Sequence, residues 1–131
     1  MILFLRVFFI VVLASMLSVT TWASLRCPLF GVPREVATHP WFIATLFDAY
    51  WGFLTFYLWT CYQHPRWLAR LGWFIAIMLL GNIAMASYCL ALLFRAPRDA
   101  APAGLLTQRQ DGASPLAWIL AAAGGTVVAL A

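Results

Sequence analysis

The sequence predicts an all-α membrane protein, a polytopic bundle of transmembrane helices in a single domain of residues 1–131. Two observations lead to this prediction. Hydrophobic residues make up 65% of the chain and charged residues 9%, whereas a soluble domain is about half apolar and a quarter charged. Long apolar segments also alternate with connectors that contain proline, glycine or arginine. A water-soluble fold of this size could not bury so much apolar surface, so we expect a lipid bilayer around the chain.

Three segments are long enough to cross a bilayer, whose hydrocarbon core takes about 20 residues of helix. They are about residues 7–23, 40–62 and 71–94. A fourth segment, about 115–131, is predicted to be a further span. It is short, like the first, and is weakened by its two adjacent glycines, although Ser114-Pro115 is typical of a helix start. For the first segment the alternative is a signal peptide cleaved after Ala23. We favour a retained span.

The connectors 24–39, 63–70 and 95–114 determine the expected orientation, because arginine and lysine are enriched in cytoplasmic loops. With four spans, 24–39 and 95–114 lie on one side and hold five of the eight arginines, so a bare count favours an outside N-terminus. Density favours the reverse, since Arg66 and Arg70 crowd an eight-residue turn and Arg6 precedes the first span. We expect a multi-pass inner-membrane protein with its N-terminus in the cytoplasm.

Several functional classes are disfavoured by the residues present. The three cysteines are scattered without a CxxC motif, and His39 and His64 lie alone in different connectors, so we expect no disulfide framework and no metal site. No nucleophile–base pair or phosphate-binding glycine loop is present. We therefore expect no enzyme, no catalytic residue and no cofactor. The net charge of +4 is explained by loop arginines and does not indicate nucleic-acid binding.

One carboxylate, Asp48, stands near the middle of the second apolar segment. Positions spaced by alternating four and three residues share one helix face. From Trp41 that face carries Thr45, Asp48, Gly52 and Thr55, which include the one acidic residue and the one glycine of the segment. An aspartate at the centre of a membrane helix costs about 2.5–3.5 kcal/mol, so we expect this face to point into the bundle.

The depth of Asp48 predicts its neighbours if the first and third segments run antiparallel to the second. The matching levels give a polar layer of Ser15, Ser18, Asp48, Asn82, Ser87 and Tyr88. From it we take Asp48, Thr45, Asn82, Tyr88 and Ser18 as candidate binding residues. Two interpretations stay open. The layer either holds the helices together by hydrogen bonds, or Asp48 binds a proton, a cation or a lipid head group.

The middle of the chain resembles a known family. The blocks ATLFDAYWGF and LGNIAMASY, separated by a basic turn, are similar to small membrane proteins of bacteria and plants classified as a domain of unknown function. The resemblance covers about residues 40–93. The polar and small positions shared with that family are Thr45, Asp48, Tyr50, Gly52, Gly81, Asn82 and Tyr88. This sequence departs from the family at Gln63-His64, where a Lys-Glu pair is usual.

These observations predict a general role for the protein but no chemical reaction. We expect a non-enzymatic structural or accessory membrane protein whose partners are the lipid bilayer and either a second copy or a larger membrane complex. The alternative is a small transporter, or a proton- or cation-binding membrane protein, that uses Asp48. Known four-span multidrug transporters carry their membrane acid in the first span, whereas Asp48 lies in the second segment.

Overall fold

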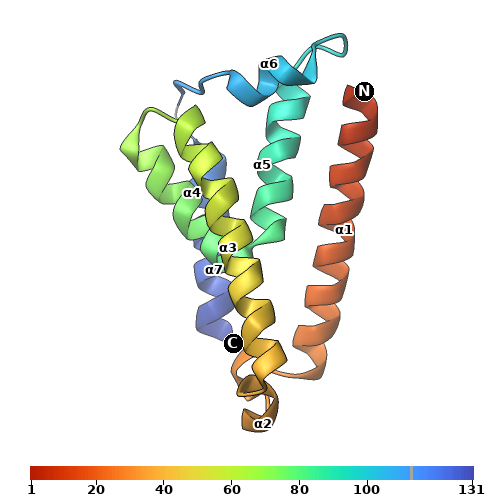
Figure 1. The fold of residues 1–131 in the computed structure, drawn as a ribbon, viewed down its shortest axis with the longest axis vertical. Coiled ribbons are helices and arrows are strands. Elements are labelled where there is room, and N and C mark those ends of the chain that lie inside the picture. The colour runs from red at the N-terminus through yellow and green to blue at the C-terminus, as the bar shows by residue number, and fades with distance from the viewer. Residues whose placement is uncertain (113) are drawn as a thin grey trace.

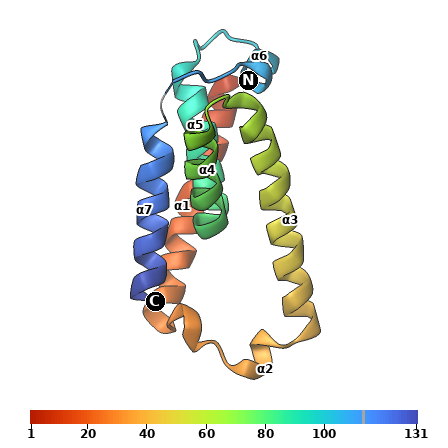
Figure 2. The same ribbon diagram turned by 90° about the vertical axis from the view of Figure 1, so that its left-hand side faces the viewer.

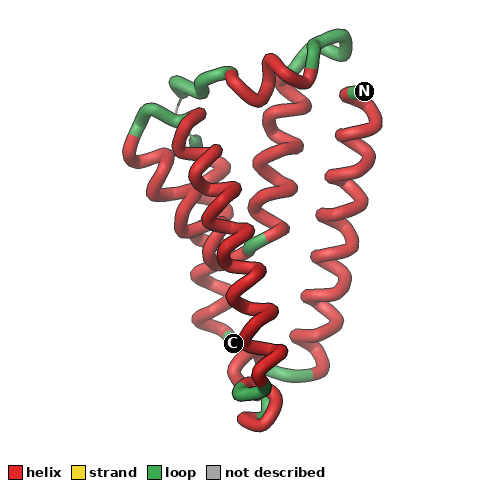
Figure 3. Tube along the Cα trace, in the orientation of Figure 1, coloured by secondary structure: helices red, strands yellow, loops and turns green. Residues whose placement is uncertain are grey.

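The computed structural model describes residues 1–112 and 114–131, and the regular structure in these ranges is entirely helical (Figure 3). The elements are α1 (Ile2–Arg26), the 3₁₀ turn η1 (Leu29–Gly31), α2 (Arg34–Ala37), α3 (Pro40–Gln63), α4 (Trp67–Leu80), α5 (Asn82–Arg95), α6 (Pro102–Thr107) and α7 (Pro115–Leu130). The prediction of an all-α fold is confirmed.

Two connectors contain short helices that the sequence analysis did not predict. The first holds η1 and α2, and the 95–114 linker holds α6. Both short α-helices begin next to a proline, with Pro33 at the N-cap of α2 and Pro102 in the first turn of α6. Proline is favoured in the first turn of a helix, as at Pro102, because its fixed φ angle suits that turn and the first N–H groups need no partner within the helix.

The third apolar segment folds back on itself at Gly81 (Figures 1 and 2). Gly81 has φ +51°, a conformation that favours glycine. It ends α4 through its N–H to Ile77 O at 2.8 Å, and its own carbonyl accepts from Met85 N in α5. The rings of Trp73 and Tyr88 then meet with centroids 4.7 Å apart. In one straight helix, positions 73 and 88 would lie roughly 22 Å apart.

The prediction of a single span over residues 71–94 is therefore wrong. Helices α4 and α5 have 14 residues each, about 21 Å of helix, which is less than the roughly 30 Å hydrocarbon core. Hydropathy could not reveal the reversal, because both halves of the segment are apolar. A helical hairpin and one continuous helix made of these residues have the same hydropathy profile. One consequence is topological: the 95–114 linker returns to the end of the molecule that holds the 63–70 turn (Figure 1).

The hairpin of α4 and α5 is enclosed by two longer helices. Helix α7 packs along α4, and α1 packs along α5. The α4–α7 contact is close: a Cβ atom at Gly72 would lie 3.1 Å from the Cβ atom of Ala117, and one at Gly124 would lie 2.8 Å from the Cβ atom of Leu79. Small residues of this kind are typical of helix contacts in membranes. Figure 2 shows α3 diverging from α1 and α7 toward its N-terminal end.

The buried core lies within the hairpin and its contact with α7. A residue set from α4, α5 and α7 forms the main cluster: Trp73, Ala76, Ile77, Ala84, Tyr88, Leu92, Ala117 and Ala121. A smaller cluster of Ile2, Leu93 and Ala96 joins the start of α1 to the end of α5. Arg6 reinforces this junction, since its guanidinium donates to the carbonyl of Leu93 at 2.7 Å and to that of Ala96 at 3.1 Å.

By length and hydropathy, one helix of the described residues, α1, is able to cross a membrane, and an N-terminal signal sequence would meet the same criterion. Only a small part of its apolar surface is buried against the rest of the chain.

A candidate binding site at the arginine-rich end

Six of the eight arginines gather at one end of the molecule, and the candidate site lies there. They are Arg6, Arg66, Arg70, Arg95, Arg98 and Arg109. We call this the arginine-rich end. It is built from the start of α1, the end of α3, the 64–66 turn, the end of α5 and the linker that holds α6 (Figure 1).

Gln63 connects three of these parts. Its side chain is fully buried. The Tyr88 hydroxyl donates to Gln63 Oε1, which joins α5 to the end of α3. Gln63 Nε2 donates to the carbonyl oxygens of Leu105 and Leu106 in α6, at 2.7 and 3.2 Å, and the Gln110 N–H donates to the Gln63 carbonyl at 2.7 Å. This amide side chain therefore positions the linker over the hairpin.

His64 is buried beside Gln63 but its imidazole nitrogens are unpaired. Its side chain is 3% exposed, and neither Nδ1 nor Nε2 has a hydrogen-bond partner among the described residues. The ring packs beside the Trp73–Tyr88 pair, with its centroid 6.5 Å from that of Trp73 and 5.8 Å from that of Tyr88. Burial lowers the pKa of His64 below its usual value, and the positive charges of Arg95 and Arg70 add to this shift.

A small cavity of about 20 Å³ adjoins the imidazole. Its lining includes His64, Trp73, Arg95 and Gln110. The indole N–H of Trp73 is also buried without a partner among the described residues. A cavity of this size holds about one water-sized polar group, so the space beside His64 offers hydrogen-bonding groups to a small polar occupant.

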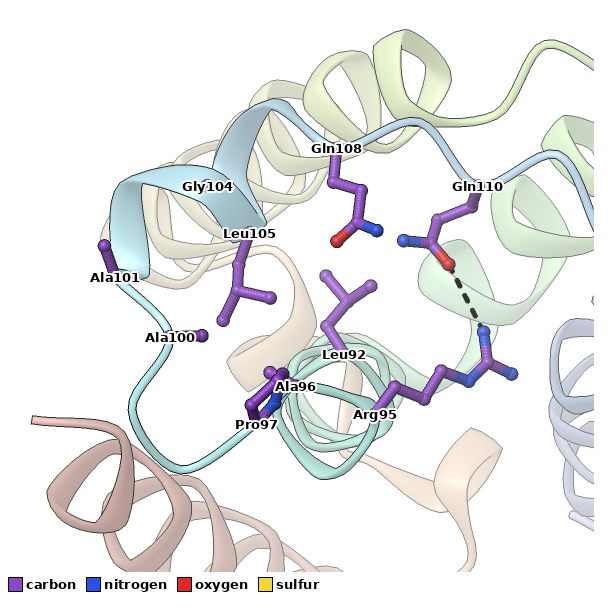
Figure 4. Close-up of a pocket in the computed structure, with 10 residues that line it drawn as sticks. All are labelled: Leu92, Arg95, Ala96, Pro97, Ala100, Ala101, Gly104, Leu105, Gln108 and Gln110. Atoms are coloured by element: carbon purple, nitrogen blue, oxygen red, sulfur yellow. Dashed lines mark hydrogen bonds between the residues drawn. The ribbon is translucent and has the colours of Figure 1, made fainter.

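A larger cavity of about 410 Å³ lies next to the small one, between the end of α5 and the linker (Figure 4). Its lining consists of Leu92, Arg95, Ala96, Pro97, Ala100, Ala101, Gly104, Leu105, Gln108 and Gln110. Arg95 is the one charged residue in this lining and has no acidic neighbour there. Its Nη1 donates to Gln110 Oε1 at 3.3 Å, which Figure 4 shows at the polar side of the cavity.

An apolar cavity of about 310 Å³ continues from the polar one toward α1 and α3. Its lining consists of Leu5, Phe9, Trp59, Cys89, Leu92, Leu93, Pro102, Leu105 and Leu106. Leu92 and Leu105 belong to both linings, so the two cavities adjoin. The indole N–H of Trp59 donates to the Leu106 carbonyl at 3.0 Å, which leaves the apolar ring to line the cavity. The end of the molecule thus offers a polar cavity and an apolar one side by side.

The residues predicted to form a polar layer lie elsewhere and do not meet. Asp48, Thr45, Ser18 and Asn82 are exposed, and Tyr88 is buried against Gln63 at the arginine-rich end. The hydroxyls of Thr45 and Ser18 donate to carbonyls of their own helices, each at 2.8 Å. The same holds for Ser15 and Ser87.

The predicted placement of Asp48 inside the bundle is therefore wrong for this chain by itself. The estimate of depth assumed a straight third span, and the reversal at Gly81 instead puts Asn82 at the tip of the hairpin and carries Tyr88 back toward its open end. A binding role for these residues stays a prediction.

The structure brings together Gln63, His64 and Arg95, none of which is among the candidate binding residues predicted from the sequence. The sequence analysis treated the first two as connector residues. One signal was present, because the polar pair Gln63-His64 directly follows the apolar second segment. A polar pair directly after an apolar segment indicates that its neighbours are no longer lipid, but which groups meet it depends on the hairpin.

A family model described as "Protein of unknown function (DUF1475)" matches residues 1–116. The match includes α1 to α6 and all residues of the candidate site. The predicted resemblance to a domain of unknown function is thereby confirmed, and the match extends beyond residues 40–93 in both directions. No curated protein and no solved structure matches the chain.

Proposed function

The chain belongs to the family described as protein of unknown function (DUF1475), so its role has to be inferred from its own geometry, and we propose that it is a multi-pass inner-membrane protein with a non-enzymatic, accessory role. In this proposal α1, α3 and α7 span the bilayer. The hairpin of α4 and α5 enters from the cytoplasmic side and returns to it.

The distribution of arginines is the observation that supports this proposal most. With the hairpin re-entrant, Arg26 and Arg34 are the two arginines at the opposite end, against six at the arginine-rich end. Arginine is strongly enriched on the cytoplasmic side of membrane proteins. In this arrangement the two ends differ clearly in their number of arginines, which supports a cytoplasmic location for the arginine-rich end and the N-terminus.

Exposed apolar side chains support a bilayer around the helices. Leu3 is 73% exposed and Trp41 78%, and large apolar side chains are exposed along much of α1 and α3. A soluble monomer rarely exposes a continuous apolar patch of more than a few hundred Å². Lipid chains would cover this surface at no cost.

Helix α3 is long enough to cross the bilayer beside α1, and α7 is shorter. The 24 residues of α3 give about 36 Å of helix and the 16 residues of α7 about 24 Å. The hydropathy of α3 is reduced by its many tyrosines and tryptophans, which favour membrane interfaces. Helix α7 is short for a full crossing, and its contact with α4 stabilises it within the protein.

Cysteine labelling in intact cells tests the orientation. In a chain with Cys61 and Cys89 replaced by serine, the exposed native Cys27 should react with a membrane-impermeant maleimide. With Cys27 also replaced, a cysteine introduced at Arg66 or at Gly104 should resist the reagent until the cells are opened. Labelling at 104 with protection at 66 would show that the hairpin crosses the membrane, and would overturn the proposal.

A small transporter that uses Asp48 is the second candidate, and the geometry favours it less. Asp48 is exposed on α3 rather than directed toward the hairpin or a cavity. A transport pathway at Asp48 would require a second copy or another protein to enclose it. The accessory role needs no such addition.

A further inference from the structure

We propose that the two adjoining cavities at the arginine-rich end bind an anionic amphiphile from the cytoplasmic leaflet, with its charged head group at Arg95 and its acyl chain in the apolar cavity. This inference rests on the proposed membrane location and cytoplasmic orientation. It goes further by naming the chemical class that the accessory protein holds.

The polar cavity is complementary to an anion. Arg95 contributes the one charge in its lining, and Gln108 and Gln110 contribute amide groups. A guanidinium carries five N–H donors, and Arg95 uses one in its bond to Gln110 among the described residues. Phosphate and carboxylate oxygens accept charge-assisted hydrogen bonds from such a group, commonly two at a time.

His64 is a second and independent indication of a polar occupant. Its imidazole is almost fully buried, yet both nitrogens lack a partner among the described residues. The small cavity beside the imidazole is also lined by Arg95 and Gln110, which line the larger cavity as well. Buried polar groups normally have a hydrogen-bond partner. A head group or a water bound with it would supply one.

The apolar cavity is suited to an acyl chain. Its lining is made of leucine, phenylalanine, proline, tryptophan and cysteine side chains from α1, α3, α5 and α6. Cys89 lies six residues before Arg95 on α5, about 9 Å along the helix axis. A chain that leaves a head group at Arg95 would pass Cys89 as it enters the hydrocarbon region. Both cavities fall within the range of 300–1,000 Å³ that is common for ligand sites.

The native Cys89 thiol provides a probe of occupancy. The full chain, with Cys27 and Cys61 replaced by serine, is purified in a neutral maltoside detergent. The rate of Cys89 modification by a small uncharged thiol reagent is then measured against palmitoyl-lysophosphatidic acid, and against palmitoyl-lysophosphatidylcholine, which has the same chain and no net charge. Inorganic phosphate is added as a competitor in a third series.

We expect the anionic lipid to protect Cys89 at a concentration at least about tenfold lower than the neutral one, as one charge-assisted hydrogen bond provides. Arg95→Gln should remove this difference. Arg95→Lys should retain most of it, and Arg98→Gln is the matched control, since Arg98 lies three residues away outside both linings. Phosphate at the same concentration should not displace the lipid.

Three results would overturn the inference. Equal protection by the two lipids would show that the head group is not recognised. An equal loss in Arg98→Gln would show that only the overall charge matters. Displacement by phosphate at equal concentration would indicate a site for a soluble anion rather than an amphiphile. Cysteine labelling in cells does not depend on lipid binding, so failure of the orientation would be recognised separately.

Discussion

The imidazole of His64 is buried in its neutral form, and this gives the protein a specific sensitivity to acid. Because burial lowers the pKa of His64 from 6.5, the unfolded chain binds a proton at a pH where the folded chain does not. In that window the free energy of unfolding decreases as pH falls. The stability that depends on neutral His64 is fully present well above pH 6.5. It is lost progressively as the pH falls from 6.5 toward the lower pKa of His64 in the folded protein.

We therefore expect the unfolding temperature of the detergent-purified protein to fall between pH 7.5 and pH 5. His64→Gln, which cannot be protonated, should flatten this dependence. His39 is exposed, so His39→Gln is the matched control and should behave like the parent. A pH profile that is unchanged by His64→Gln would show that His64 is not buried as described.

Asp48 is the residue for which the structure reverses the expected outcome of mutation. The predicted polar layer implied that Asp48→Ala would lose an interhelical hydrogen bond worth about 1–2 kcal/mol. In the structure the Asp48 side chain is exposed on α3. We now expect Asp48→Ala and Asp48→Asn each to change the unfolding free energy of the monomer in detergent by less than about 0.5 kcal/mol. Chemical denaturation measures this free energy. A larger loss in Asp48→Ala than in Asp48→Asn would restore the interpretation that the polar layer holds the helices together by hydrogen bonds.

The reversal between α4 and α5 depends on one glycine. A Cβ atom at Gly81 would lie 2.6 Å from the Phe53 ring, and the φ angle of +51° is unfavourable for any other residue. We expect Gly81→Ala to destabilise the protein by about 1–3 kcal/mol, the usual cost of a residue held in a disfavoured backbone conformation. Thermal and chemical unfolding in detergent measure the loss.

Gly52 is the matched control for Gly81. It lies inside α3, and a Cβ atom there would meet no atom within 4 Å. Gly52→Ala should be neutral or slightly stabilising, because alanine favours helix more than glycine does. Equal stabilities for the two alanine variants would contradict the hairpin. If α4 and α5 straightened in Gly81→Ala, a cysteine at position 104 would change sides in the labelling experiment.

The contacts of α1 with the rest of the molecule favour its retention over cleavage. Ile2 is buried, and Arg6 joins α1 to the carbonyls at the end of α5. Cleavage after Ala23 would remove these contacts and one wall of the apolar cavity, to which Leu5 and Phe9 belong. We expect mass spectrometry of the protein purified from membranes to detect peptides from residues 1–23. A product that begins at Ser24 would show that α1 is a signal peptide.

The candidate site could be anticipated only in part from the sequence. Arg66 and Arg70 were recognised as a basic turn, and Tyr88 was selected as a polar residue of the third segment. Its partner, Gln63, could not be identified, because Tyr88 reaches Gln63 only when α5 runs back along α4. Arg95 and Gln110 are likewise brought to His64 by the return of the linker.

The helical class, the apolar segments and the arginine-containing connectors could all be predicted from the residues alone. These properties follow from composition and local periodicity, since each helix satisfies its own backbone hydrogen bonds. Three features could not be predicted in this way: the hairpin in the third segment, the end of the molecule that holds the linker, and the place where the polar residues meet. Those outcomes depend on one backbone reversal at Gly81 and its contact with Phe53, and hydropathy carries no information about the direction in which an apolar helix continues.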